Sequence, residues 1–290
     1  VVAARETANG AVAEILHADG TRSERACDIL VGADGIHSAL RQQFHPDEGA
    51  PRWNGMMMWR GTTLARPFLD GRTMVQAGHR RAKFVVYPIE PVRPDGLQRI
   101  NWICDRRLRE DGFGGGLTAP SREDWSKPGS LDDLLPTFGS WRFAWLDVPG
   151  LIRAAEQILE WPMVDRDPLP RWRHGHTTLL GDAAHPMYPI GSNGATQAIL
   201  DAAALADALD GHASITAALN AYEAARLPMT RDIVAMNRRE GLDAILDMVE
   251  EAAPEGFARI EDVTDPTVLA EWVQAYKRAA GHQVARPQAA

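Results

Sequence analysis

The stretch from Thr177 to Thr196 constrains the fold of this chain more than any other segment. It begins with a short β-branched and apolar run that ends on Gly181-Asp182, which indicates a strand followed by a tight turn. Glycines at positions 191 and 194 then open a strongly periodic helix. Open α/β sheets bind nucleotide ligands where strands end and helices begin. The segment therefore predicts an α/β domain with a ligand site at this turn.

A second segment of the same kind lies near the beginning of the chain. Residues 27–41 contain an apolar strand that ends in Asp34-Gly35. Ser38 stands where it can cap a short helix that carries Arg41. A domain-sized insert separates the two segments, so we expect one domain to be assembled from two distant parts of the chain.

Both segments resemble the internal fingerprints of the FAD-dependent aromatic hydroxylases, the single-component flavoprotein monooxygenases. The resemblance implies that the carboxylate of Asp182 binds a ribityl hydroxyl of FAD. It also implies that residues 189–196 lie beside the flavin ring, where the amides of a helix start stabilise negative charge. The cofactor-binding residues implied in this way are Asp34, Gly35, Arg41, Gly181, Asp182, Ala183, Pro189, Gly191, Ser192, Asn193, Gly194, Ala195 and Thr196.

These residues also have structural alternatives. Asp182 could be a turn or helix-cap aspartate, and residues 189–196 could be a plain helix-start loop. Asp34 could form an internal salt bridge with Arg41. His185 is expected to pack within its motif, because the histidines of this region lack the spacing of common metal sites.

The predicted fold class is α/β with an α+β insert. We expect a Rossmann-like FAD-binding domain from residues 1–45 and 161–240, an antiparallel-sheet substrate domain from residues 46–160, and a C-terminal helical tail from residues 241–290. The chain shows no Gly-x-Gly-x-x-Gly motif. We therefore expect the FAD-binding domain to be N-terminally incomplete and to lack at least one βαβ unit. The alternative is a complete protein that dispenses with the pyrophosphate loop.

The secondary structure follows from local patterns. The predicted strands are residues 1–4, 11–17, 23–31, 56–63, 73–77, 83–89, 99–105 and 177–180. The predicted helices are residues 38–44, 131–138, 148–159, 194–209, 215–239 with a kink at Pro228, and 267–279, followed by a frayed end at residues 281–290. The apolar stripe of the helix after Gly194 is predicted to be Ala195, Ala198, Ile199, Ala202, Leu205, Ala206 and Leu209. Asp201 and Asp207 lie off that stripe.

The insert carries aromatic and basic residues that suit a pocket for an aromatic substrate. The candidates are Trp59, Arg60, Tyr87, Trp102 and Met163. The surrounding motifs resemble the phenazine-modifying and salicylate hydroxylase-like branches of the family. Arg60 could pair with a substrate carboxylate through its guanidinium. The alternative for each aromatic residue is packing in the core, and Arg60 could equally be a surface arginine.

The resemblance implies an FAD-dependent monooxygenase in which NAD(P)H reduces FAD and O2 adds to the flavin C4a position. The resulting hydroperoxide would hydroxylate a phenazine- or salicylate-like ring. The motifs require no acid or base, so no catalytic residue is assigned. The alternatives are an FAD-dependent reductase or halogenase on the same scaffold, and a non-catalytic flavoprotein remnant.

Composition limits the partners that the chain can have. Of its 290 residues, 39 are acidic and 31 are Lys or Arg, which gives a net charge of −8 and disfavours nucleic-acid binding. The chain has 2 cysteines, which suggests a reducing compartment such as the cytoplasm. No apolar run is long enough to predict a membrane span. We expect a small aromatic substrate and O2 as partners, and a homodimer remains open.

Overall fold

The computed structural model describes residues 1–112, 116–121, 124–239 and 243–279. The chain forms two compact units. Unit 1 consists of Val1–Arg52, Asp165–Leu242 and Thr267–Ala290, and unit 2 consists of Trp53–Val164 and Asp243–Pro266. Residues 241–290, which the sequence suggested as one C-terminal tail, are thus divided between the two units.

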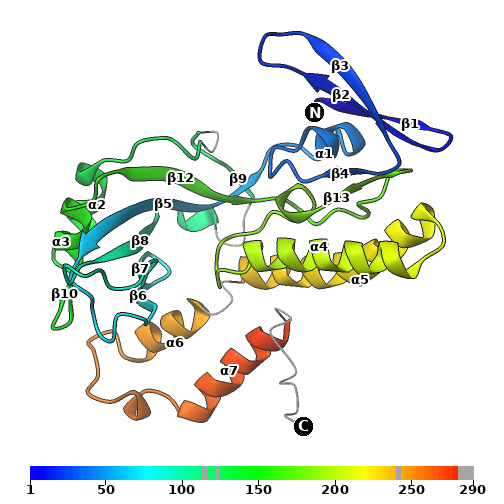
Figure 1. Ribbon diagram of the computed structural model, residues 1–290. Coiled ribbons are helices and arrows are strands. Elements are labelled where there is room, and N and C mark those ends of the chain that lie inside the picture. Colours follow the sequence, from blue (N-terminus) through cyan, green and yellow to red (C-terminus); the bar gives the residue numbers. More distant parts are fainter. Residues whose placement is uncertain (113–115, 122–123, 240–242, 280–290) are drawn as a thin grey trace. The chain divides into compact units, whose positions relative to one another are not determined.

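Unit 1 begins with an antiparallel sheet of three strands, which Figure 1 shows in dark blue. Strands β1 (Ala3–Thr7), β2 (Gly10–Leu16) and β3 (Arg22–Cys27) follow one another in this sheet. The prediction of a single strand over residues 23–31 is wrong. The chain leaves this sheet after Cys27, and β4 (Leu30–Gly32) pairs with a different strand because its backbone groups bond to residues 177–179.

A parallel pair of strands forms the centre of unit 1. Strand β4 pairs with β13 (Thr177–Leu179), and Gly32 lies opposite Leu179. Helix α1 (Ala39–Phe44) follows β4 and begins as predicted, because the Ser38 hydroxyl accepts a hydrogen bond from the amide of Arg41 at 3.0 Å. The one-turn 3-10 helix η2 (Gly181–Ala183) follows β13.

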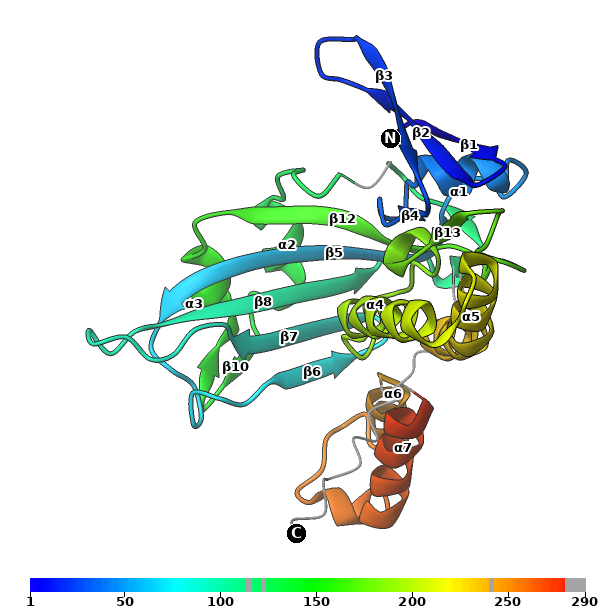
Figure 2. The ribbon, with the colours of Figure 1, turned by 45° about the vertical axis from the view of Figure 1, so that its right-hand side comes forward.

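Two long helices pack side by side below this pair of strands (Figures 1 and 2). They are α4 (Gly194–Gly211) and α5 (Ile215–Arg238), and α5 continues through Pro228. The buried apolar core of unit 1 joins helices and strands through Leu40, Trp172, Leu179, Leu219 and Tyr222.

The apolar stripe predicted for α4 is wrong. The residues of α4 that are buried are Gln197, Asp201, Leu205 and Ala208. Ile199, which belongs to the predicted stripe, is 70% exposed. The inward face is thus turned by about one residue from the prediction and carries two polar side chains.

Unit 2 is built on a curved antiparallel sheet (Figure 2) with the strand order β12-β5-β8-β7-β6. Its strands are β5 (Arg52–Ala65), β6 (Val75–His79), β7 (Ala82–Pro88), β8 (Gln98–Arg107) and β12 (Ile158–Asp165). Shorter strands are β9 (Leu117–Thr118), which pairs with β5, and β10 (Arg142–Phe143) with β11 (Leu146–Asp147). Successive side chains of the central strands point to opposite faces of the sheet, and buried side chains occur on both faces. Other parts of the chain must therefore pack against each face.

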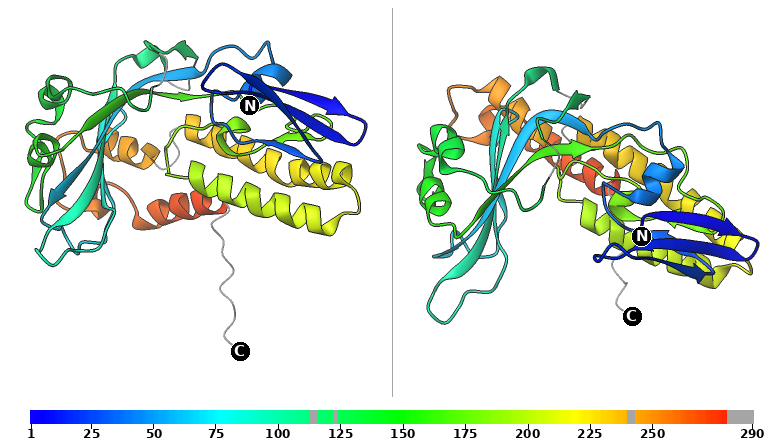
Figure 3. Two further views of the ribbon diagram at one scale, coloured as in Figure 1. Left: turned by 45° about the horizontal axis from the view of Figure 1, so that its top comes forward. Right: turned by 90° about the horizontal axis from the view of Figure 1, so that it is seen from above.

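Helices α2 (Leu131–Phe138) and α3 (Val148–Arg153) lie on one face of this sheet, and α6 (Ala244–Ala252) lies on the other (Figure 3). The helix predicted over residues 148–159 is correct only as far as Arg153. Ile158 and Leu159 instead open β12, where the sheet provides backbone partners that a local pattern does not reveal. Helix α6 was not predicted.

The remaining elements are the short 3-10 helices η1 (Glu110–Gly112) and η4 (Ile260–Asp262), and helix α7 (Pro266–Ala279). The frayed end predicted at residues 281–290 lies outside the described residues. In the part of the chain that the structure describes, no helix combines the length and apolar character needed to cross a bilayer. The same part holds no group of three or more side chains suited to bind a metal ion, and Cys27 and Cys104 are both free thiols.

Candidate cofactor site

The two sequence fingerprints meet at the carboxyl ends of β4 and β13. The amide of Leu180 donates to the carbonyl of Gly32 at 2.9 Å, so the two strands end side by side. Asp34 follows Gly32 by two residues, and Asp182 follows Leu179 by three. Parallel pairing therefore brings both Asp-containing turns to one edge, where ligands of α/β sheets bind.

The loop around Asp182 presents that side chain outward. Gly181 has φ +60, a left-handed conformation that lets the chain turn sharply after β13. Ala183 and Ala184 are buried, whereas the Asp182 side chain is exposed. Desolvation by the surrounding loop raises the pKa of the Asp182 carboxyl, and nearby His185 opposes this shift. The carboxylate is thus available to accept hydrogen bonds from a ligand.

The first turn of α4 lies next to this carboxylate. A Cβ atom placed on Gly194 would lie 4.0 Å from Asp182 Oδ1. Gly191 (φ +76) and Ser192 (φ +53) both adopt left-handed conformations before the helix. Asn193 occupies the N-cap position without a side-chain cap hydrogen bond, and its buried Nδ2 has no hydrogen-bond partner.

This geometry fits the part of FAD that the resemblance implies. A helix start without a side-chain cap offers amide donors and a partial positive charge to an electron-rich group. The orphaned Asn193 amide adds one more donor at the same place. The outward carboxylate of Asp182 suits a hydroxyl-bearing chain. Among the predicted residues of this stretch, Asp182, Pro189, Ser192 and Ala195 are exposed, and Gly191, Gly194 and Thr196 are half-buried.

Asp34 caps α1 and forms no salt bridge with Arg41. Its Oδ2 atom accepts a hydrogen bond from the amide of Ala39 at 2.9 Å. Gly35 has φ +81, and a Cβ atom there would meet no atom within 4 Å. The proposed Asp34–Arg41 salt bridge is therefore wrong, because the Arg41 guanidinium is directed to other partners.

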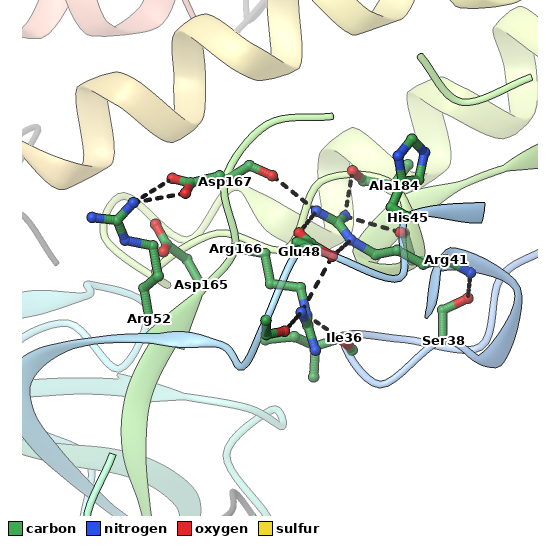
Figure 4. Close-up of polar contacts among 12 residues, drawn as sticks. Ile36, Ser38, Arg41, His45, Glu48, Arg52, Asp165, Arg166, Asp167 and Ala184 are labelled. Atoms are coloured by element: carbon green, nitrogen blue, oxygen red, sulfur yellow. Dashed lines mark hydrogen bonds and ion pairs between the residues drawn. The ribbon is translucent and has the colours of Figure 1, made fainter. Parts of the chain in front are cut away.

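Arg41 is 1% exposed, and all of its side-chain nitrogens donate to the protein (Figure 4). Nε and Nη2 bind the two carboxylate oxygens of Glu48. Nη1 donates to the carbonyl oxygens of Ala183 at 3.1 Å and Ala184 at 2.8 Å, and Nη2 also donates to the carbonyl of Asp167 at 2.8 Å. These bonds use the five donors of a guanidinium. Arg41 therefore holds the loop that carries Asp182, with no donor left for a cofactor.

A second polar cluster surrounds the segment by which the chain returns to unit 1 (Figure 4). Arg52 Nη1 donates to both carboxylate oxygens of Asp167, and Arg238 bonds to both Asp165 and Asp167. Burial raises the pKa of Asp165 to about 6, against the opposing effect of Arg238. No local sequence pattern reveals this cluster, because its members come from separate segments.

The predicted substrate residues of unit 2 divide between the two faces of its sheet. Trp59 and Trp102 lie on the face covered by α2 and α3. Trp59 pairs with Cys104, and Trp102 lies two residues before Cys104 on the same strand, so the two tryptophans share a face. Trp102 is completely buried, and its Nε1 donates to the Thr63 hydroxyl at 3.0 Å. The Trp59 ring lies under the guanidinium of Arg106. These contacts correspond to the core-packing alternative for both tryptophans.

Arg60 and Tyr87 lie on the opposite face. Arg60 Nε donates to Asn101 Oδ1 at 2.6 Å, and Asn101 is the register partner of Tyr87. The Arg60 side chain is exposed and that of Tyr87 is half-buried. Asn101 is completely buried, and its Nδ2 has no hydrogen-bond partner. Met163 is 2% exposed, and its sulfur accepts from Asn54 Nδ2, so its contacts are those of a packed core residue.

The sequence comparisons identify a related group of proteins. Residues 149–237 match the family described as FAD binding domain. The chain is 49% identical over 211 residues to phenazine 1,6-dicarboxylic acid hydroxylase PhzS of Lysobacter antibioticus, which covers 72% of this chain and 50% of that protein. It is also 38% identical over 229 residues to 3-amino-4-hydroxybenzoate 2-monooxygenase PtmB3 of Streptomyces platensis. That match covers 77% of this chain and 52% of the relative. The chain thus spans about half the length of these curated relatives.

Solved structures share the fold. A salicylate hydroxylase in a substrate complex superimposes with a TM-score of 0.65 at 23% identity and covers 100% of this chain and 71% of that one. HpxO of Klebsiella pneumoniae, in a complex with FAD and uric acid, gives a TM-score of 0.62 at 23% identity. The match covers 96% of this chain and 61% of the HpxO chain. Over about half of the length of its relatives, the chain is thus similar to the FAD-dependent aromatic hydroxylases in sequence, and it shares their fold.

Proposed function

We propose that this chain is the FAD-contacting and substrate-contacting portion of a monooxygenase that hydroxylates an aromatic substrate with NAD(P)H and O2. The observation that carries the proposal is the pairing of the outward Asp182 carboxylate with the start of α4, which lacks a side-chain cap. Bound FAD would supply the redox and oxygen chemistry. The matched relatives named for a phenazine dicarboxylic acid, a hydroxybenzoate and salicylate support a carboxylated aromatic substrate.

The residues of the chain would have distinct tasks in this reaction. Asp182 would accept hydrogen bonds from the ribityl hydroxyls of FAD. The amides at the start of α4 would stabilise negative charge on the electron-rich edge of the ring system. Arg60 would pair with the carboxylate of the substrate, while Asn101 holds its guanidinium in place. No side chain is assigned a proton transfer.

Cofactor binding is tested with the natural full-length protein that contains this chain. Asp182→Asn keeps the size of the side chain but loses the charge and one acceptor, so FAD should bind about tenfold more weakly, as expected for one hydrogen bond to a charged group. Asp207→Asn, on the exposed side of α4, is the matched control and should bind FAD like the wild type. Equal FAD affinity of all three proteins, measured by flavin fluorescence titration, would contradict the assignment.

The reaction is tested by oxidation of NAD(P)H in the presence of phenazine carboxylates and salicylate, with product oxygen traced from labelled O2. We expect stimulated oxidation and one labelled oxygen atom in the product. Arg60→Gln should raise KM for carboxylated rings, whereas Arg93→Gln, at an exposed arginine of unit 2, should not. Oxidation without labelled product would favour a reductase or halogenase instead.

A further inference from the structure

The inward face of α4 carries a buried polar cluster that the apolar pattern of the helix does not predict. Asp201 and Gln197 are both 0% exposed, and Arg226 of α5 is 5% exposed. His185, which follows the Asp182 loop, is 3% exposed. We propose that Asp201 is a positioning residue of the cofactor site, which fixes the Asp182 loop against the start of α4. This inference rests on the proposed function, because it assigns a task within the same site.

Asp201 binds both ends of the loop. Its Oδ2 atom accepts a hydrogen bond from the amide of Gly181 at 3.0 Å. The same oxygen lies 2.5 Å from Nε2 of His185. Gly181 and His185 flank the three residues that include Asp182, so one carboxylate holds the loop at its entry and at its exit.

The other oxygen of Asp201 connects the loop to the helix start. Arg226 Nε donates to Asp201 Oδ1 at 2.7 Å, and Arg226 Nη2 donates to Gln197 Oε1 at 2.6 Å. Gln197 Nε2 in turn donates to Oδ1 of Asn193, the N-cap residue of α4, at 3.1 Å. An unbroken chain of buried hydrogen bonds therefore runs from the Asp182 loop to the N-cap residue of α4.

These partners favour the charged carboxylate form of Asp201. Burial raises the pKa of Asp201, but the hydrogen bonds from His185, Arg226 and Gly181 outweigh it, so the pKa lies below its ordinary value. The carboxylate can only accept, which places the proton of His185 on Nε2. Nδ1 of His185 is buried and has no hydrogen-bond partner.

Stability alone does not explain this cluster. Buried ion pairs can often be replaced by apolar side chains without loss of stability, because desolvation of the charges offsets their attraction. A carboxylate, however, is the one side chain of this size that accepts from three donors in different directions. The same loop is held from its other side by Arg41, which binds the carbonyls of Ala183 and Ala184. The two clamps leave Asp182 as the outward member of a fixed loop.

Asp201→Asn tests the inference with a minimal change of shape. The amide nitrogen that this substitution introduces must face either Arg226, which cannot lose a proton, or the amide of Gly181 together with His185. In both orientations two donors meet and one hydrogen bond is lost. Asp207→Asn removes the same charge from an exposed position of α4. Leu219→Ala, in the core of unit 1, is a control for simple loss of stability.

The first measurement is amide hydrogen exchange on the 290-residue chain without added cofactor. We expect Asp201→Asn to speed exchange at residues 181–186, with little change in β1 to β3, whereas Asp207→Asn should match the wild type. The second measurement is FAD titration of the natural full-length protein at a temperature where every variant is folded. Asp201→Asn should weaken FAD binding about tenfold, as expected for one charged hydrogen bond, and should shift the visible absorption bands of the flavin.

The inference is overturned if Asp201→Asn leaves both loop exchange and FAD affinity unchanged. It is also overturned if Leu219→Ala weakens FAD binding and shifts the flavin bands to the same degree, because the effect would then come from lost stability. A wild-type protein that binds no FAD would refute the proposed function instead. In that case the exchange measurement still decides whether Asp201 holds the loop.

Discussion

Arg238 and Asp165 form a two-point ion pair in unit 1. Arg238 Nε donates to Asp165 Oδ2 at 2.7 Å, and Nη2 donates to Oδ1 at 2.9 Å. Asp165 is the last residue of β12, and Arg238 is the last residue of α5. Asp165 is 0% exposed, so its charge depends on this partner. The pair therefore joins two points of the chain that are distant in sequence.

Replacing Arg238 should show how much this pair contributes. Arg238→Ala leaves a buried carboxylate without its partner, which should cost about 3–5 kcal/mol in the free energy of unfolding at pH 8. Because the pKa of Asp165 is already about 6, loss of Arg238 should raise it further. Protonation of Asp165 then relieves the cost, so the loss of stability should be smaller at pH 5. Urea unfolding at both pH values measures this difference.

Arg231→Ala is the matched control, since Arg231 is an exposed residue of the same helix. It should change the free energy of unfolding by no more than about 0.5 kcal/mol. Equal losses for Arg231→Ala and Arg238→Ala would show that the buried pair has no special weight.

Arg41→Lys should loosen the Asp182 loop although it keeps the positive charge. Lysine has three donors in place of five, so at least two of the bonds to Glu48 and to the carbonyls of residues 167, 183 and 184 are lost. We expect a loss of about 2 kcal/mol in the free energy of unfolding. Arg5→Lys, at an exposed ion pair, should be close to neutral. Thermal unfolding of the two variants separates these cases, and identical midpoints would count against the proposed clamp.

His174 should make the chain less stable in mild acid. Burial and the positive charge of Arg171 lower the pKa of His174 to about 4. The unfolded state, with an ordinary histidine pKa near 6.5, therefore binds more protons between about pH 4 and pH 6.5. The contribution of His174 to stability should rise with pH across that window, whereas Asp165, whose pKa is raised to about 6, contributes in the opposite direction. The urea midpoint of the wild type relative to that of His174→Gln should therefore be higher at pH 7 than at pH 5.

His174→Gln removes this titrating group, so between pH 5 and pH 7 its urea midpoint should rise less, or fall more, than that of the wild type. The stacking of His174 on Phe44 is also altered, which lowers stability at every pH and leaves the slope as the relevant quantity. His17→Gln, at an exposed histidine in the turn after β2, should keep the slope of the wild type. A mutant slope equal to that of the wild type would assign the acid sensitivity to other groups.

Lys83 should be essential for holding α6 on the sheet of unit 2. Its ammonium group bonds to Asp105 of β8 and to Asp243, which precedes α6, and all three side chains are buried. These carboxylates raise the pKa of Lys83, despite its burial. Lys83→Met would leave two like charges unpaired, at a cost of about 3–5 kcal/mol. In Lys83→Met, amide exchange should become faster in α6 than in the wild type, and the change in α2 should be smaller.

The triple variant Lys83→Met with Asp105→Asn and Asp243→Asn removes all three charges. It should recover most of the stability that Lys83→Met loses, since no unpaired charge remains. If the triple variant is no more stable than Lys83→Met, the destabilisation comes from packing of the lysine stem and not from charge.

Local signals were sufficient to locate the two Asp-containing turns and the start of α4. The apolar run before Gly181-Asp182 and the glycines at positions 191 and 194 define a strand, a turn and a helix start within about twenty residues. Backbone preferences of that kind act over a few residues, which is why α1 and α4 begin as predicted. The same reasoning failed at residues 158–159, where strand β12 forms because β5 provides its partners.

The identity of the clamping residues depended on contacts between distant segments. Arg41 was assigned to the cofactor from its motif, yet its donors are used by Glu48 and by carbonyls more than 120 residues away. Trp59 and Trp102 were candidates for the substrate pocket, but sheet register places them under α2 and α3. A sequence pattern shows which residue types are present, and it does not show which face of a sheet a helix will cover.

The sequence by itself determined that two Asp-containing turns follow two strands and that a helix begins beside one of them. The tertiary structure alone decided that Asp201 faces inward. The alanines of α4 are distributed around most of the helix surface, so the apolar pattern of the helix does not favour one face strongly. The orientation is set by Arg226 on the neighbouring helix, because a buried guanidinium requires an acceptor and Asp201 is the carboxylate that reaches it.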